Sequence, residues 1–129
     1  MRAFVVPLSL LAALSATPAS ACLEIVTPEA EARAFNQADV VVRVRALTED
    51  YLAVPNTPSL RVGVATGQVT EVLKGRAENG NVITYRVVDG EGRGPTCPAR
   101  RFTHPGGSYK LYLKQPADWG PPTILLPTD

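Results

Sequence analysis

Valine alternates with polar residues in the most regular segment of this chain. Residues 38–47 read ADVVVRVRAL; the even positions from 40 to 46 are all apolar, while Arg43 and Arg45 lie at odd positions. A period of two, rich in valine, predicts a strand with one buried face. We expect both arginines to lie on the solvated face of this strand; a basic groove for a ligand is the alternative.

Four further strands are predicted, separated by residues that favour turns. The first of them is long enough for one bent strand or two short ones, and Gly63 and Gly67 are natural positions for a bend or a bulge. Lys74-Gly75 ends this segment, and residues 77–80 form a turn. The four predicted strands cover residues 60–73, 81–88, 109–113 and 123–126.

A short helix is predicted before the first strand. Thr27 can accept a hydrogen bond at the helix start, Pro28 suits the first helical position, and Glu29 complements the positive end of the helix dipole. The helical pattern continues to about Phe35, and the two polar amides that follow end it.

Two long connections are predicted to be loops. Residues 48–59 contain two prolines, yet Tyr51, Leu52 and Val54 are unusually apolar for a loop. These three side chains either fold back on the core or form a contact surface. Residues 89–108 are rich in glycine and proline, which prevents a long helix. A loop of this length in a small domain is usually functional or held in place.

Two conspicuous side chains are assigned no function. His104 is the single histidine, and we expect it in a turn without catalytic duty, because the chain contains no nucleophile elbow, P-loop or HExxH pattern. Trp119 lies in the turn 116–122, and we expect it in the core, where it and the last strand would close the sheet. The chain is therefore not expected to be an enzyme, and no cofactor is predicted.

The first 21 residues have the pattern of a signal peptide. Arg2 is their only charge, residues 4–14 are apolar, and Ala19-Ser20-Ala21 matches the signal-peptidase cleavage pattern. We therefore expect an exported protein, periplasmic or extracellular, whose mature domain is 22–129. Such compartments permit disulfides.

Cys22, the first mature residue, has two alternative fates. A cysteine directly after a signal peptide can carry a lipid and anchor the protein to the envelope, although Ala19 stands where the lipidation motif usually has a large aliphatic residue. The other fate is a disulfide with Cys97, because two cysteines in an exported chain usually pair. This bond would close a long loop and contribute roughly 4 kcal/mol of stability.

Charge argues against nucleic acid and against an anionic membrane as partners, unless a lipid on Cys22 provides the membrane anchor. Removing Arg2 from the 13 basic residues leaves 12, against 12 acidic ones. Binding to phosphates relies on excess positive charge.

Strand tyrosines beside strand arginines can make a stacking site for nucleic-acid bases, but such tyrosines usually pack in the core. The residues in question are Tyr85, Tyr109 and Tyr112 with Arg43, Arg45 and Arg86. One histidine and two cysteines also argue against a metal site of the chain's own.

The order of these elements resembles the N-terminal domain of the tissue inhibitors of metalloproteinases (TIMPs) and the wider netrin-module family. Residues 38–43, ADVVVR, are similar to that family's A-D-V-V-I-R strand, and residues 69–75, VTEVLKG, to its strand that ends in Lys-Gly. Cys22 as the first mature residue, then Cys97 and a later Gly-Gly pair, follow in the family's order. The resemblance covers nearly the whole mature chain. It implies an all-β fold with a short N-terminal helix, built as a five-stranded OB-like barrel.

The inhibitory chemistry of that family implies a role for the mature N-terminus. In the tissue inhibitors, the amino group and carbonyl oxygen of the first cysteine chelate the zinc of the protease, and the next side chain enters its specificity pocket. Carried over, Cys22 would chelate, Leu23 would fill the pocket and Cys97 would tether Cys22. Glu24 departs from the family, because the vertebrate inhibitors carry a second cysteine there.

The resemblance therefore implies a protein partner, and specifically a zinc metalloprotease. The alternative is an envelope interaction domain, anchored or tethered at Cys22, that binds its partner through one of the long loops without metal chemistry.

Overall fold

The computed structural model describes residues 26–90 and 100–128, which form one helix and a six-stranded sheet. The expected all-β fold with a short N-terminal helix is confirmed. In chain order the elements are α1 (Pro28–Gln37), β1 (Val40–Val54), β2 (Thr57–Lys74), β3 (Val82–Gly90), β4 (Arg100–Arg101), β5 (Ser108–Lys114) and β6 (Thr123–Ile124).

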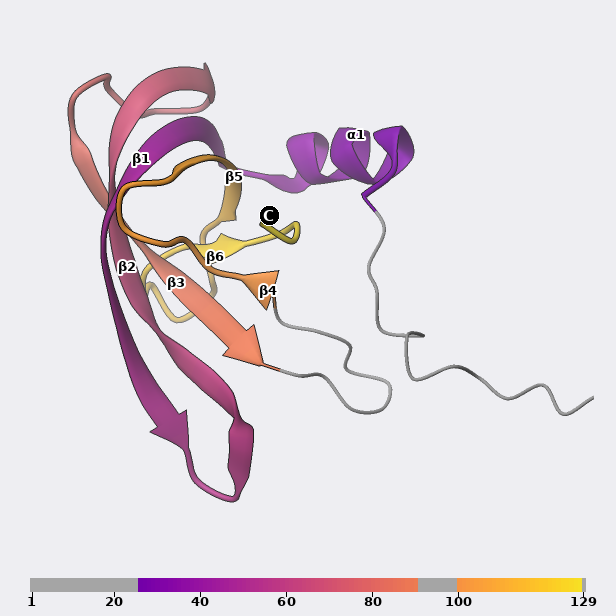
Figure 1. Cartoon of the computed structure of the whole chain (residues 1–129). Coiled ribbons are helices and arrows are strands. Elements are labelled where there is room, and N and C mark those ends of the chain that lie inside the picture. Colours follow the sequence, from indigo (N-terminus) through magenta and orange to yellow (C-terminus); the bar gives the residue numbers. More distant parts are fainter. Residues whose placement is uncertain (1–25, 91–99, 129) are drawn as a thin grey trace, which may run out of the picture.

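Five of these strands close into a ring, in agreement with an OB-like fold (Figure 1). β1 pairs antiparallel with β2 on one side and with β5 on the other, and β2 pairs antiparallel with β3. β6 closes the ring because it pairs antiparallel with β5 and parallel with β3. The two-residue β4, which the sequence pattern does not predict, pairs with the end of β3.

α1 begins at the predicted residues. The Thr27 hydroxyl accepts a hydrogen bond from the Ala30 amide at 3.1 Å, and proline occupies the first turn. The helix continues to Gln37, and Lys74 Nζ donates to the Phe35 carbonyl at 2.6 Å and to the next carbonyl at 3.2 Å. These bonds satisfy carbonyls that a helix leaves free at its C-terminus. Among the residues described, no helix is both long and apolar enough to cross a membrane.

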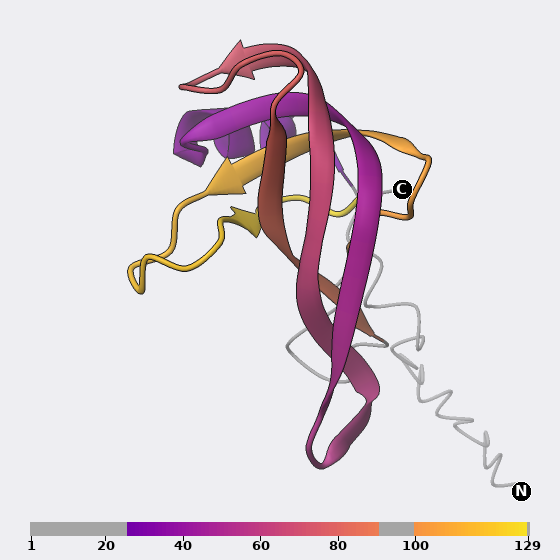
Figure 2. The same cartoon turned by 90° about the vertical axis from the view of Figure 1, so that its left-hand side faces the viewer.

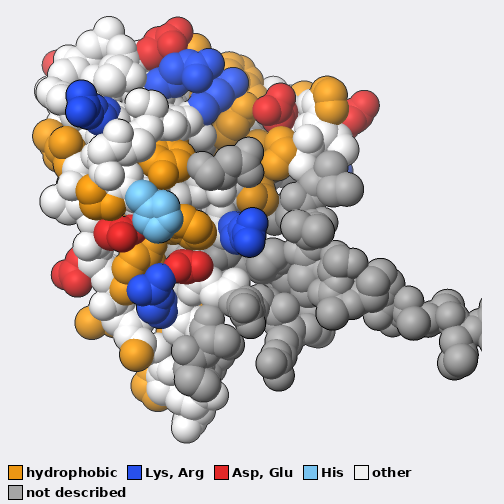
Figure 3. All heavy atoms as spheres, viewed as in Figure 1, with side chains coloured by type: hydrophobic (Ala, Val, Ile, Leu, Met, Phe, Trp, Pro, Cys, Tyr) orange, Lys and Arg blue, Asp and Glu red, His pale blue; other side chains and the backbone are white. Residues whose placement is uncertain are grey.

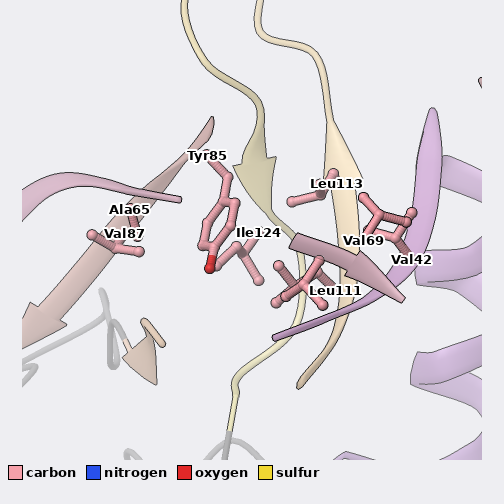
Figure 4. Close-up of a cluster of buried hydrophobic side chains, with 9 residues drawn as sticks. Val42, Ala65, Val69, Tyr85, Val87, Leu111, Leu113 and Ile124 are labelled. Carbon is pink, nitrogen blue, oxygen red and sulfur yellow. The ribbon is translucent and has the colours of Figure 1, made fainter. Parts of the chain in front are cut away.

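The main core fills the inside of the ring (Figure 4). Val42 and Val44 of β1 are fully buried, whereas Arg43 and Arg45 are exposed, so the predicted faces of this strand are confirmed. A second cluster joins Val41 on the opposite face of β1 to α1 and β5. The ring core consists of Val42, Val44, Ala65, Val69, Tyr85, Val87, Leu111, Leu113 and Ile124.

β1 changes its inward-facing positions at Leu47. Ala46 pairs with Gly67 and Thr48 with Thr66, so Leu47 is an extra residue in the ladder, a β-bulge. Before the bulge, the even positions face the core. Beyond it the odd positions do, as the packing of Tyr51 against the core shows. The extra residue therefore shifts the inward-facing positions from even to odd numbers, while the inner face itself continues along the strand.

The prediction of a loop over residues 48–59 is wrong. β1 continues to Val54, β2 begins at Thr57, and only two residues between them form the turn. Asn56 has a φ of 64°, and proline followed by a residue with positive φ is typical of a type II turn. Pro55 therefore helps to make a hairpin instead of interrupting one. We call residues 48–66 the arm, and Figure 2 shows its tip extending well beyond the ring.

Two glycines allow the long strands to approach each other closely. A Cβ on Gly63 would lie 1.8 Å from the carbonyl oxygen of Asp50, and a Cβ on Gly67 would lie 3.0 Å from Cβ of Val44. Gly67 also lies at the bulge, as predicted for it. β2 is nevertheless one continuous strand.

Candidate functional site

The residues predicted for the N-terminal wedge and the disulfide lie outside the described part of the chain. These are Cys22, Leu23 and Glu24, together with Cys97. The structure therefore locates only the third predicted group, the apolar residues of the arm.

The three apolar residues of the arm do not act as one group. Tyr51 points to the inner face of the arm and packs against the ring core. Leu52 points outward and is 71% exposed, while Val54 pairs with Thr57 at the turn. The prediction that these side chains fold back on the core is thus confirmed for Tyr51, whereas Leu52 provides exposed surface.

Exposed aliphatic side chains cover the outer face of the arm. Leu52 pairs with Val62 across the hairpin, and Val62 in turn pairs with Val88 of β3. Val62 and Val64 keep 37% and 40% of their surface exposed. Adjacent apolar side chains on two or three strands make a continuous patch, which is the kind of surface that protein partners cover.

The inner face of the arm has the opposite chemistry. Five polar or ionisable side chains meet there, and we call them the inner polar group: Glu49, Tyr51, Arg61, Asp89 and His104. Arg61 pairs with Asp89 at 2.5 Å, and its guanidinium lies 4.6 Å from the centre of the Tyr51 ring. Figure 3 shows the histidine beside acidic and basic side chains on this face.

Glu49 and Tyr51 carry buried polar atoms that the described residues leave unsatisfied. Oε2 of Glu49 and the hydroxyl of Tyr51 have no hydrogen-bond partner of good geometry. His104 Nδ1 lies 3.4 Å from this oxygen. Burial, and then the nearby Glu49 carboxylate, raise the pKa of Tyr51 above its usual value, so the phenol stays protonated.

His104 is held at the rim of this group by its backbone. Its amide donates to the Tyr109 hydroxyl at 3.1 Å, and its ring lies 4.8 Å from that of Phe102. The side chain itself is 61% exposed. His104 is therefore a turn residue, as predicted, whose side chain reaches a carboxylate of the arm.

The tyrosines considered for nucleic-acid stacking are mostly packing residues. Tyr85 and Tyr112 are buried, and the Tyr85 hydroxyl bonds to Thr103 at 2.6 Å. Burial raises the pKa of Tyr85. Of the arginines proposed with them, Arg43 pairs with Glu71 at 3.0 Å and Arg86 pairs with Asp118 at 2.8 Å. These pairs reduce the charge available to a phosphate.

The prediction that Trp119 lies in the core is wrong, because this side chain is 88% exposed. Its φ of 61° falls in the left-handed region that bulky residues avoid. The turn is braced around it. Asp118 accepts from Arg86 and from the Gly120 amide, and Gln115 donates to the Gly120 carbonyl at 2.7 Å. These bonds hold the indole outside the ring.

Within residues 26–90 and 100–128, no three potential metal ligands of the His, Cys, Asp and Glu types come together. A scan against models of known protein families finds no match for this chain, and a search of curated proteins finds none either.

Sequence reasoning missed Glu49, Arg61 and Asp89 as a group. Glu49 lies in a segment predicted to be a loop, and its inward direction depends on the bulge at Leu47. Arg61 and Asp89 face each other only because β2 and β3 pair in this register. One sequence signal was available. Residues 49, 51 and 53 can be taken as a strand face of their own, out of step with the even-numbered face of residues 40–46.

Proposed function

We propose that this chain is an exported binding module of the tissue-inhibitor and netrin type, whose arm engages a protein partner. The observation that carries the proposal is the arm itself. Its tip extends past the ring, and its outer face presents Leu52, Val62 and Val64 to solvent. Burying such side chains is favourable, at about 25 cal/mol per Å² of apolar surface. The hairpin also keeps this surface ordered before binding, which lowers the entropic cost.

The N-terminal wedge is the second part of the proposal. Cys22 and Leu23 would bind the zinc and the specificity pocket of a metalloprotease, with Cys97 as the tether. Val26 and Thr128 line one cavity of about 420 Å³, and the Thr128 amide donates to the Arg100 carbonyl at 2.8 Å.

Chain length is compatible with that tether. Cys22 precedes Val26 by four residues and Cys97 precedes Arg100 by three. Extended chain spans about 3.5 Å per residue, so both cysteines have the reach to meet near Thr128. The chain on both sides is thus long enough for the Cys22–Cys97 disulfide that we propose.

Co-purification from the native host tests the arm. The full chain would be expressed with a C-terminal tag, and the partner retained on the tag would be identified and quantified. We expect Leu52→Ser to lower the yield of that partner at least tenfold, since central apolar contacts cost about 1.4 kcal/mol or more when removed. Val82→Ser is the matched control, because Val82 is 59% exposed on β3 but lies off the arm. Equal yields for both variants would exclude the arm as the contact.

Inhibition assays test the wedge separately. The mature protein would be assayed at micromolar concentration against a panel of zinc metalloproteases. We expect inhibition that is lost when one alanine is added before Cys22, because the added residue displaces the chelating amine. No inhibition of any protease would remove the wedge and leave the arm proposal standing.

The intact mass of the protein from its own host decides the state of Cys22. A chain that starts at Cys22 and gains two hydrogens on reduction has the disulfide and a free amine. A mass raised by lipid would instead make the protein an anchored envelope module without zinc chelation.

A further inference from the structure

Among residues 26–90 and 100–128, the edge of β1 in the arm has no partner strand, and we call it the open edge. β1 pairs with β5 only as far as Arg45, and Ala46 makes the last bonds on that side, with Gly106 and Gly107 at 2.8 Å. From Thr48 to Val54, β1 pairs with β2 alone among the described residues. Figure 2 shows this half of β1 at the border of the sheet.

The direction of each side chain shows which backbone N–H and C=O groups of β1 point to this edge. Residues of one strand that share a face also direct their amides to the same side of the strand. Ala46 faces inward and directs its N–H and C=O toward β5. Glu49, Tyr51 and Ala53, which face inward beyond the bulge, therefore direct theirs to the open edge. Three successive bonding positions are available to an added strand.

Charge specifies the chemistry of such a strand. Arg61 bonds Asp89 directly and acts on Glu49 only through the longer-range attraction of their charges, while the exposed imidazole of His104 lies 3.4 Å from the buried Oε2 of Glu49. Burying a carboxylate oxygen without a direct hydrogen bond from a cation is costly. A residue added opposite Glu49 would place its Cβ about 5 Å away. A lysine or arginine there has the length to bond Glu49 Oε2 and the Tyr51 hydroxyl.

A second copy of this chain is a poor occupant of the edge. Two β1 edges paired antiparallel about Glu49 would bring the two Glu49 carboxylates face to face, and paired about Tyr51 they would place Glu49 opposite Ala53, which supplies no cation. Like charges in cross-strand positions destabilise the pairing. The acidic edge thus favours a basic strand from a different protein.

We propose that the open edge of β1, from Glu49 to Ala53, binds an extended segment of a partner protein by strand addition, with a lysine or arginine of that segment bonded to Glu49. The inference rests on the proposed function, since it names the part of the arm that would hold the partner. It concerns the inner face and the edge, whereas the co-purification test above concerns the outer face.

Amide hydrogen exchange on the isotope-labelled mature protein tests the inference. The probe is a capped peptide of about six residues, the usual length of a strand, in which lysine alternates with valine. At a peptide concentration about ten times the dissociation constant, exchange at Glu49, Tyr51 and Ala53 is expected to slow about tenfold. The same peptide with glutamate in place of lysine is the matched probe, and it should protect none of the three amides.

Two variants separate the backbone contribution from the charge contribution. Ala53→Pro removes an N–H on the open edge while leaving the β1–β2 ladder intact, and it should abolish protection at the two remaining amides. Glu49→Gln keeps the shape but not the charge, and it should weaken binding of the lysine peptide about tenfold. Val82→Ser, which changes an exposed side chain of β3 off the arm, should leave peptide binding unchanged.

Three results would overturn the inference. They are no protection by the lysine peptide, equal protection by both peptides, or protection of these amides by self-association of the free protein. If the lysine peptide gives no protection, the charge of Glu49 would serve to keep other strands away from this edge. If Leu52→Ser still loses the natural partner in that case, the proposed function stands without the edge.

Discussion

The two halves of β1 are one continuous strand, yet they have opposite roles. From Val40 to Ala46 the strand has a partner on both edges, and its inward side chains are buried in the ring. From Thr48 to Val54 it has β2 alone among the described residues, and its inward side chains include Glu49. The difference predicts that most of the stability of this molecule resides in the ring, to which Ala65 of the arm also belongs, while the outer face of the arm is free to vary.

Truncating a large apolar side chain should give the largest difference in the free energy of unfolding between the ring and the arm. Leu111 is fully buried opposite Val42, and Leu111→Ala should lower the free energy of unfolding by about 3 kcal/mol. Leu52→Ala, the same change on the arm, should alter it by less than about 0.5 kcal/mol. Urea unfolding of both variants measures this. Similar losses would mean that the arm is part of the cooperative core.

Adding one methyl group tests how closely the strands of the arm approach. Gly63→Ala should cost about 1–3 kcal/mol, because the new Cβ meets the backbone of Asp50, which cannot rotate away. Gly67→Ala meets side-chain atoms of Val44 at 3.0 Å and should cost less. Amide exchange should show faster opening of the arm in Gly63→Ala. A larger loss at Gly67 would contradict the geometry.

Two tyrosine hydroxyls provide a finer comparison. Tyr85→Phe removes the buried bond to Thr103 and leaves the threonine hydroxyl unsatisfied, so it should cost about 1–2 kcal/mol. Tyr51→Phe removes a hydroxyl with no well-formed bond and should be neutral within about 0.5 kcal/mol. Thermal or urea unfolding distinguishes them. An equal cost for both would show that the Tyr51 hydroxyl forms a stabilising hydrogen bond, with the Glu49 carboxylate as the neighbour able to accept it.

The smallest expected effect concerns pH and the turn that carries Trp119. Hydrogen bonding by Arg86, and then by the Gly120 amide, lowers the pKa of Asp118. A carboxyl whose folded pKa is lowered stabilises the fold above its unfolded pKa, about 3.9, and loses that contribution as pH falls below it.

Asp118→Asn should therefore make the urea midpoint less dependent on pH between about 5 and 3, while Arg86→Met should do the same. An unchanged pH dependence in both variants would exclude the pair as its source. Quenching of Trp119 fluorescence reports whether the turn itself loosens over the same range.

The sequence pattern predicts the ring better than it predicts the arm, for a physical reason. Burial imposes alternation on Val42 and Val44, and capping chemistry marks Thr27 and Pro28, so both features can be recognised locally. The arm depends on a bulge and on pairing between distant residues, which alternation within one window does not reveal. Trp119 misleads because tryptophan is usually well buried, whereas here a braced turn with positive φ exposes it.

The bulge at Leu47 also has a consequence for how this protein can change over generations. Loss of the single codon for Leu47 would place Thr48 directly after Ala46, so strict alternation would return with Glu49 and Tyr51 still on the inner side. The strand would lose a local bend, while the ring would keep its buried valines and the arm would keep both of its surfaces. A residue inserted or deleted elsewhere in the arm, where no bulge absorbs it, would instead exchange the two surfaces. Position 47 is therefore a place where relatives could differ in length and still present the same side chains to a partner.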